Sequence, residues 1–256
     1  MQGDDFISAA IVTYNDGEEA VSACRSILEH TKRYRLKLYV IDNSETDETA
    51  EMLERVDGIT LLRQYKNTGF GAAHNRVLKE KLGKYHFIIN PDITVNSDVI
   101  SYMVDMFEAS SETVMAMPKI CYPDGSEQKL PKEIPTFKRL FLGRLAPLGG
   151  LFARIRAEYT WADREINGIT DIDFCTGCFC GIRSEVFRKL GGFDERFFMY
   201  LEDADLTLRA KQYGRVVFDP SVSVTHAWHR DSAKRIKYLF IHLTSTVKFL
   251  LKRRNK

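Results

Sequence analysis

The stretch FISAAIVTYNDGEEAVSACRSILEHTKRYRLKLYVID, residues 6–42, contains a strand, a helix and a second strand in succession. Residues 6–14 form a short apolar run, which is typical of a buried strand. Apolar residues then recur at helical spacing, at Ala20, Val21, Cys24, Ile27 and Leu28. The run over 36–42 predicts the next strand. A unit of this length favours two parallel strands with the helix packed on the sheet.

The alternation of strands and helices continues to residue 117. Further strands are predicted over 59–64, 86–90 and 114–117, and helices over 70–81 and 97–108. The spacing of Ser44 and Asp47 predicts a cap for one more helix. Repeated units of this kind define an α/β fold, with a mainly parallel, Rossmann-like sheet flanked by helices.

Polar residues lie where three of the predicted strands end. Thr13 ends the first strand, Asp42 ends the second, and Asn90–Asp92 follows the strand over 86–90. The carboxyl ends of parallel strands share one edge of the sheet, and ligands bind at that edge. A single Asp or Asn at such a position is also typical of a turn, but three together favour a binding site.

The regular alternation is lost between residues 118 and 170. Five prolines interrupt this segment, and Gly149–Gly150 adds a flexible point. Residues 132–156 combine six basic residues and one acidic residue with many leucines and phenylalanines. We expect one domain over 1–229 that carries an irregular basic insertion at about 118–170. The basic, leucine-rich segment is a candidate floor for an acceptor site or a candidate membrane contact.

The last residues form a basic, amphipathic segment. Residues 230–256 contain nine Lys or Arg and one Asp, a charge of +8; because the chain carries +2, residues 1–229 carry −6. Apolar residues recur at three- and four-residue steps, at Ile236, Leu239, Phe240, Leu243, Val247, Leu250 and Leu251. This pattern predicts a C-terminal helix. Its apolar face either docks on the domain or lies on an anionic membrane surface.

Composition excludes several classes of protein. The 256 residues are 44% hydrophobic and 28% charged, which is typical of a globular chain and not of a disordered or collagen-like one. No apolar run reaches the roughly 18 residues of a membrane-spanning helix, and the first ten residues lack the pattern of a signal peptide. Five cysteines favour a reducing, cytoplasmic setting over a disulfide-rich secreted fold.

Two groups of acidic residues are candidates for chemistry. Asp92 follows the buried run FIINP, so it stands where a carboxylate can hold Mg²⁺ or Mn²⁺ against phosphate oxygens. Glu202, Asp203 and Asp205 cluster in YLEDADL at the start of a predicted helix. Acids there are favoured by the helix dipole, but one of them can also serve as a general base when burial or neighbouring charge tunes its pKa.

A third candidate is the glycine-containing segment NTGFGAAHN, residues 67–75. Gly69 and Gly71 permit a tight loop and a close approach of backbone to ligand before a helix. No Gly-Lys-Ser/Thr follows, so the segment is not a Walker loop.

Five motifs now stand in order along the chain. They are IVTYN at 11–15, DNSETD at 42–47, NTGFGAAHN at 67–75, NPD at 90–92 and GCFCGIRSEVFRKLGGFDERFFMYLEDADLTLR at 177–209. Together they resemble family-2 glycosyltransferases with the GT-A fold, especially the bacterial rhamnosyltransferase-like branch. The resemblance extends from about Phe6 to His229.

The resemblance implies roles for particular residues. Asp203 would be the catalytic base, paired with Glu202, and Asp92 with His226 would hold the metal, Mg²⁺ or Mn²⁺, on the donor diphosphate. Asp42 would accept a hydrogen bond from the pyrimidine base. The nucleotide-sugar site as a whole would comprise Thr13, Tyr14, Asn15, Asp42, Asn43, Ser44, Asn67, Gly69, Phe70, Gly71, Asn75 and Asn90. Two positions depart from the family pattern: Asn90 replaces the first acid of Asp-x-Asp, and His74 replaces an Arg.

The function that the resemblance implies is inverting transfer of a sugar from a nucleotide-diphosphate donor. The expected donor is dTDP-L-rhamnose or a UDP-hexose. The expected acceptor is a saccharide or a lipid-linked saccharide in bacterial surface polysaccharide synthesis. We expect cytoplasmic localisation, with possible peripheral contact of residues 230–256 with the plasma membrane, and no nucleic-acid partner. The alternatives are a sugar-phosphate nucleotidyltransferase and a non-catalytic protein that binds membrane or nucleic acid through its basic tail.

Several other residues have a structural and a functional interpretation. Cys175, Cys178 and Cys180 are spaced as zinc ligands are, but a fourth ligand is missing, and packing in a strand is the favoured interpretation. His229 could bind a ligand or fill a hydrogen-bonded niche. Trp161 and Trp228 could stack on a sugar or pack in the core.

Overall fold

The structure is a computed structural model, and it describes residues 6–130, 132–228 and 236–254. The predictions that concern residues 230–235, 255–256 and His229 lie outside the described residues.

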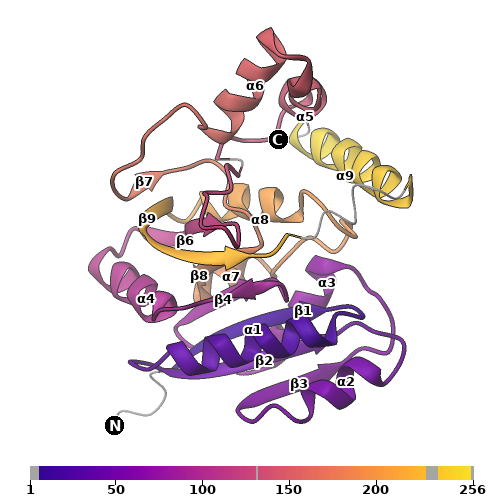
Figure 1. Ribbon diagram of the computed structural model, residues 1–256, viewed down its shortest axis with the longest axis vertical. Helices are drawn as coiled ribbons and strands as arrows, with labels where there is room; N and C mark the ends of the chain where they lie inside the picture. The colour runs from indigo at the N-terminus through magenta and orange to yellow at the C-terminus, as the bar shows by residue number, and fades with distance from the viewer. Residues whose placement is uncertain (1–5, 131, 229–235, 255–256) are drawn as a thin grey trace.

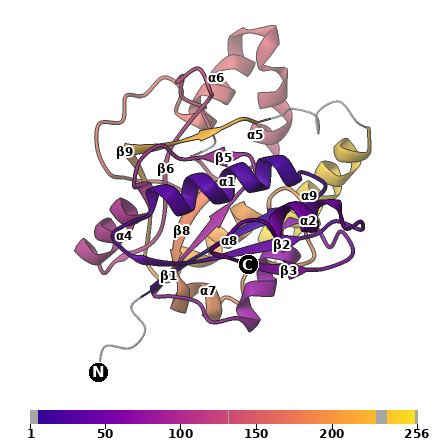
Figure 2. The ribbon, with the colours of Figure 1, turned by 60° about the horizontal axis from the view of Figure 1, so that its bottom comes forward.

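The first half of the chain folds as the sequence predicts. Four strands pair in parallel in the order β3-β2-β1-β4. The central strand β1 is buried at every residue, because helices cover both faces of this part of the sheet; Figure 2 shows α1 over one face and α7 under the other. The strands are β1 (Phe6–Thr13), β2 (Arg35–Asp42), β3 (Ile59–Arg63) and β4 (Tyr85–Ile89), and the helices are α1 (Gly17–His30), α2 (Glu48–Leu53) and α7 (Ser184–Lys189).

The second half of the sheet is mixed. β8 (Phe179–Arg183) lies antiparallel between β4 and β6 (Thr113–Cys121), and β9 (Arg215–His226) runs parallel to β6. The short strands β5 (Ile93–Thr94) and β7 (Thr170–Asp171) pair antiparallel with β9. The α/β class with flanking helices is confirmed, while the parallel arrangement is confined to part of the sheet. The first four strands are joined by crossover connections, which parallel pairing requires. β8 follows the long insertion and enters the sheet antiparallel to both of its neighbours.

Two local predictions are wrong. The helix expected over 70–81 is a short α3 (Phe70–His74) that continues as a 3₁₀ helix, η1 (Asn75–Lys79). Ser44 does not cap α2: its hydroxyl accepts a hydrogen bond from the Asn15 N–H at 2.9 Å, and Asp47 at the N-cap makes no side-chain cap bond. The helix predicted over 97–108 is α4 (Val99–Ala109), which the side chain of Asp98 caps through the Ser101 N–H.

The insertion is more regular than its prolines and glycines predict. It contains α5 (Phe137–Leu142), the 3₁₀ helix η2 (Gly143–Leu148) and α6 (Gly150–Thr160). Gly149 and Gly150, which interrupt the helical pattern in the sequence, form the turn between η2 and α6, and both have positive φ. In Figure 1 these helices lie at one end of the molecule, next to the C-terminal helix.

The C-terminal helix α9 (Ile236–Arg254) docks on the domain with one side only. Phe249, 1% exposed, packs in a cluster with Tyr159, Phe174, Phe197, Leu201 and Ala204. Lys252 on the same side donates to Asp194 at 2.7 Å. The predicted apolar face is therefore divided, because Leu239, Phe240, Val247 and Leu251 remain at least half exposed. No described helix is long and apolar enough to cross a membrane.

Candidate active site

The ends of β1 and β2 build a buried, hydrogen-bonded corner. Thr13 pairs with Asp42 across the two strands, and the Asn43 N–H donates to the Thr13 carbonyl at 2.9 Å. Asp42 is fully buried and accepts from the Ser44 N–H through Oδ1 at 2.9 Å. Its other oxygen, Oδ2, has no hydrogen-bond partner among the described residues. Arg63 Nε lies 3.8 Å from Oδ2, an ion-pair contact that is too long for a hydrogen bond, so Oδ2 can still accept a hydrogen bond from a bound ligand.

The loop over residues 67–71 closes beside this corner. The Asn67 side chain accepts from the Gly69 N–H at 3.0 Å, and Asn43 accepts from the Thr68 hydroxyl at 3.1 Å. Gly69 has a φ of +86°, and a Cβ there would lie 2.3 Å from the Phe198 carbonyl oxygen. Only glycine fits this position, and the Phe70 N–H then donates to the same carbonyl at 2.9 Å.

Two of the residues in this region serve packing. The Asn75 side chain donates to the Phe193 carbonyl and to the Glu195 carboxylate, and it accepts from the Phe193 N–H. These hydrogen bonds hold the segment 193–195 in place. His74 is fully buried against Phe70 and Phe193. Burial, with a smaller contribution from His86, lowers the pKa of His74 to about 3. The residue at the family's Arg position is therefore a neutral, buried ring.

Asp92 and His226 face each other beyond the end of β4. Asp92 Oδ2 lies 3.2 Å from His226 Nε2 and accepts from the Trp228 N–H at 3.1 Å. Burial opposes ionisation of Asp92, but the His226 ring and the backbone N–H groups outweigh it and lower its pKa. Oδ1 of Asp92 is buried with no hydrogen-bond partner among the described residues. Asn90 joins this group, with its Nδ2 3.5 Å from His226 Nε2.

Gln128 fixes the orientation of the His226 ring, and sequence reasoning missed it. Its Nε2 donates to the His226 carbonyl at 2.8 Å, so its Oε1 accepts from His226 Nδ1 at 2.9 Å. In the neutral ring this tautomer leaves a lone pair on Nε2, facing the Asp92 carboxylate. Asp92 Oδ2 and a lone pair on His226 Nε2, 3.2 Å apart, would repel each other unless a proton or a cation lay between them. The pair therefore fits a divalent ion that takes one or two protein ligands and completes its shell with phosphate oxygens.

Glu202 and Asp203 begin α8 (Glu202–Ala210) after two residues in the left-handed region, Tyr200 and Leu201. Asp203 accepts from the Gly177 N–H at 3.0 Å and from the Ala204 N–H at 2.8 Å. Burial nevertheless raises the pKa of Asp203. Glu202 is 5% exposed, and burial together with the Asp203 charge raises its pKa well above the ordinary value. A raised carboxyl pKa beside a cavity is typical of a general acid or base.

The segment 177–178 connects these regions. Gly177 is in contact with Asp203 on one side and with the Phe70 ring on the other, where a Cβ would lie 3.3 Å from each. The next residue, Cys178, accepts from the Asn90 N–H at 2.8 Å. The predicted donor, metal and base residues thus lie along one continuous line of contacts.

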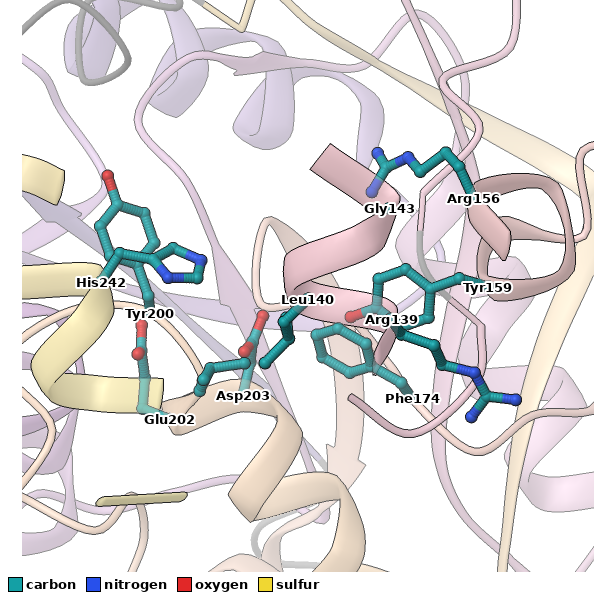
Figure 3. Close-up of a pocket in the computed structure, with 11 residues that line it drawn as sticks. Arg139, Leu140, Gly143, Arg156, Tyr159, Phe174, Tyr200, Glu202, Asp203 and His242 are labelled. Atoms are coloured by element: carbon teal, nitrogen blue, oxygen red, sulfur yellow. The ribbon is translucent and has the colours of Figure 1, made fainter. Parts of the chain in front are cut away.

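A pocket of about 260 Å³ opens in front of Asp203 (Figure 3). Asp42 and Asp92 do not line it; it is walled by the insertion, α8 and α9. Sequence reasoning identified Glu202, Asp203 and the neighbouring Tyr200, but it did not single out the other polar and aromatic lining residues, namely Arg139, Arg156, Tyr159, Phe174 and His242. The basic, leucine-rich composition of residues 132–156 was a sequence signal for Arg139 and Arg156 alone.

A zinc site at the cysteines finds no support. Cys175, Cys178 and Cys180 are free and buried. Within the described ranges, no three His, Cys, Asp or Glu side chains are placed to hold a metal ion. Burial raises the pKa of Cys178 to about 12, so its thiol stays protonated and packs as a small apolar group.

The architecture is that of the GT-A glycosyltransferases. The structure of GalNAc-T7 with UDP, GalNAc and Mn²⁺ superimposes with a TM-score of 0.64 at 18% identity, covering 86% of this chain and 43% of that one. The Pyrobaculum calidifontis mannosyltransferase PcManGT with GDP-Man and Mn²⁺ gives 0.61 at 16% identity, covering 96% and 65%. The chain therefore spans less than two thirds of each of these structures.

Sequence comparison defines the family. The family model "Glycosyl transferase family 2" matches residues 8–191, so the chain belongs to this family. It is 28% identical to the N-acetylglucosaminyl-diphospho-decaprenol L-rhamnosyltransferase of Mycobacterium tuberculosis, over 97% of this chain and 85% of the relative. It is 26% identical to the rhamnosyltransferase WbbL of Escherichia coli, over 85% and 83%. The resemblance inferred from the five motifs is confirmed.

Proposed function

We propose that the protein transfers a sugar from a nucleotide-diphosphate donor to an acceptor hydroxyl with inversion, and that Asp203 is the catalytic base. The observation that carries this proposal is the Asp203 carboxylate, which has a raised pKa, is held by two backbone N–H groups and opens on the pocket. A raised pKa makes a carboxylate a stronger acceptor for the proton of a hydroxyl group.

In the proposed reaction, an acceptor hydroxyl in the pocket donates its proton to Asp203. The acceptor oxygen forms a bond to the anomeric carbon of the donor, and the bond from that carbon to the diphosphate breaks. One displacement inverts the anomeric centre and needs no nucleophile from the enzyme. Asp42 Oδ2 would accept a hydrogen bond from the base of the nucleotide, beside the Asn43–Gly69 corner.

We propose that Asp92 and His226 hold Mg²⁺ or Mn²⁺ at the donor diphosphate. Support comes from the buried Oδ1 of Asp92, which has no hydrogen-bond partner among the described residues, and from the Gln128 bond to His226 Nδ1, which directs Nε2 of the ring toward Asp92. When bound, the ion would stabilise negative charge on the leaving diphosphate. Two solved GT-A neighbours contain Mn²⁺.

The proposed donor is dTDP-L-rhamnose, with UDP-hexoses as the second choice, and the proposed acceptor is a lipid-linked saccharide in surface polysaccharide synthesis. The names of the mycobacterial and Escherichia coli relatives support rhamnose, and the former also supports a lipid diphosphate acceptor. We further propose that the enzyme works in the cytoplasm and touches the membrane through residues 230–256, whose described part exposes four large apolar side chains. The family assignment does not favour the two alternatives considered from the sequence, which were a sugar-phosphate nucleotidyltransferase and a non-catalytic binding protein.

A transfer assay with Asp203→Asn tests the proposal. We expect transfer to fall by about 10²–10⁴-fold, the usual cost of losing a general base, while the thermal shift induced by dTDP or UDP with Mn²⁺ persists. Asp205→Asn is the matched control, because Asp205 lies on the same helix but bonds Arg209 and Lys252 and does not line the pocket. Undiminished transfer by Asp203→Asn would refute the assignment.

A further inference from the structure

The pocket in front of Asp203 has walls of opposite charge. Glu202 and Asp203 form one wall, and α6 brings Arg156 and Tyr159 to the other (Figure 3). The reaction at Asp203 needs only a hydroxyl group from the acceptor. A cation across the pocket from the base is therefore available for a second, anionic part of the same molecule.

Arg156 has a guanidinium that no carboxylate neutralises within the described residues. Its guanidinium carbon lies 5.9 Å from the centroid of the Tyr159 ring, and in Figure 3 the side chain extends from α6 toward Gly143. Arg139, the other cation of the pocket, donates to Glu133 at 3.3 Å and to the Ile134 carbonyl at 2.9 Å. Its guanidinium points away from Asp203 in Figure 3. Arg156 is thus the side chain prepared to bind an anion.

The helices that wall the pocket also expose much of the apolar surface. Nine of the fourteen large hydrophobic side chains that are exposed among the described residues lie on α5, η2, α6 and α9: Phe137, Phe141, Leu145, Leu148, Leu151, Leu239, Phe240, Val247 and Leu251. The insertion and α9 are adjacent in Figure 1, and Arg253 of α9 donates to the Pro135 carbonyl at 3.1 Å. A concentration of apolar side chains of this size indicates contact with a lipid or another apolar partner, and the basic residues among them favour an anionic bilayer.

We propose that the pocket binds an acceptor in which a phosphate or diphosphate joins the sugar to a lipid, with Arg156 as the ligand of the phosphate oxygens. The sugar hydroxyl then lies at Asp203, and the lipid leaves the pocket along the apolar side chains of the insertion and α9. A guanidinium binds phosphate through two parallel hydrogen bonds, so Arg156 also sets the position of the sugar. This inference rests on the proposed function, because it names the acceptor of the same site.

Binding of farnesyl diphosphate tests the inference without knowledge of the acceptor sugar. Titration calorimetry is carried out with the full chain and saturating dTDP or UDP, so that the donor site is filled. We expect Arg156→Ala to weaken binding of farnesyl diphosphate by at least 10-fold, Arg156→Lys to weaken it less, and farnesol to bind both forms equally. Inorganic pyrophosphate should bind more weakly than farnesyl diphosphate, because it lacks the apolar contacts.

Arg154→Ala is the matched control, since Arg154 lies two residues earlier on α6 and bonds Glu158 at 3.1 Å outside the pocket. An unchanged melting temperature shows that the variants fold. The inference is overturned if wild type does not bind farnesyl diphosphate, if Arg156→Ala binds it as well as wild type, or if Arg154→Ala loses as much.

A second variant separates this inference from the proposed function. Asp203→Asn should lose transfer and keep the binding of farnesyl diphosphate. If Asp203→Asn keeps full transfer while Arg156→Ala loses binding, the assignment of the base fails and the phosphate site stands. If Asp203→Asn loses transfer while Arg156→Ala binds normally, the phosphate site fails and the base stands.

Discussion

Asp92 and Asp203 lie on the same line of contacts but in opposite electrostatic environments. Asp92 faces the His226 ring and the Trp228 N–H, and its pKa is lowered although it is partly buried. Asp203 receives two backbone N–H groups, yet burial raises its pKa. Such a pair of carboxyl groups, with pKa values moved apart, indicates two roles: a permanent anion that holds charge and a base that takes a proton.

The sharpest test of this difference exchanges each carboxylate for its amide. We expect Asp203→Asn to lose about 10²–10⁴-fold in transfer with the nucleotide-induced thermal shift intact. Asp92→Asn should lose both transfer and the Mn²⁺-dependent part of that thermal shift, because an amide is a weaker ligand of a hard cation than a carboxylate. Measurement of both variants with dTDP and UDP, with and without Mn²⁺, checks the prediction. Identical behaviour of the two variants would contradict the division of roles.

The proposed donor and acceptor sides also differ in their exposed apolar side chains, and this difference predicts an effect on membrane binding. Leu148 and Leu151 are 74% and 64% exposed on the insertion. If they enter a bilayer, each contributes roughly 1.5–3 kcal/mol, so the double change to Ser should lower partition into vesicles at least 10-fold. Flotation with vesicles of phosphatidylcholine and phosphatidylglycerol measures it. Tyr65→Ser is the control, since Tyr65 is 63% exposed next to β3 on the donor side; an equal loss there would count against a specific membrane face.

The donor side could be predicted because its signals are local. Thr13 and Asp42 end buried strands and Asp92 follows one, and the carboxyl ends of neighbouring parallel strands meet at one edge of the sheet. The Glu202–Asp203 pair was found through a motif at a helix start. Most of the α/β fold in the first half followed from the same periodicity.

The acceptor side could not be predicted in the same way. Arg156 and Tyr159 come from a helix whose apolar residues are divided between buried and exposed positions, so it lacks the periodic pattern of a single buried face. Gln128 and His226 meet across 98 residues, and their bond depends on the mixed strand order of the second half. Tertiary packing, not local sequence, brings these side chains together, and the antiparallel direction of β8 was missed for the same reason.

Gly177 offers a way to disturb the link between the two sides with a single methyl group. A Cβ there would lie 3.3 Å from both Asp203 and Phe70, so one of them must move by a few tenths of an ångström. We expect Gly177→Ala to fold and to lose roughly 10-fold in transfer, because small displacements of a reacting group cost rate. Steady-state kinetics measures the loss. Gly125→Ala is a control for stability rather than geometry, since Gly125 is in open space with a positive φ. A loss no larger than that of Gly125→Ala would show that Gly177 does not position Asp203.

The smallest effect concerns stability and its dependence on pH. Glu202 is buried, its Oε2 has no hydrogen-bond partner within the described part of the chain, and its pKa is raised by burial and by Asp203. The folded state therefore binds the Glu202 proton more tightly than the unfolded state does. This contribution to the unfolding free energy is fully present below the unfolded pKa of about 4.3. It is lost as pH rises through the folded pKa, at about 1.4 kcal/mol for each unit of the shift.

Glu202→Gln has no charge to bury, so its unfolding free energy does not fall as pH rises. We therefore expect the variant to be more stable than wild type at pH 7–8, with the difference shrinking toward pH 4. Asp205→Asn makes the same chemical change three residues later on α8, but Asp205 bonds Arg209 at 2.7 Å and also pairs with Lys252 of α9. That variant should be less stable at neutral pH. Thermal melts of both variants between pH 4 and 8 decide the point. Equal signs would mean that the environment of Glu202 does not disfavour its charge, which contradicts the raised pKa inferred for Glu202.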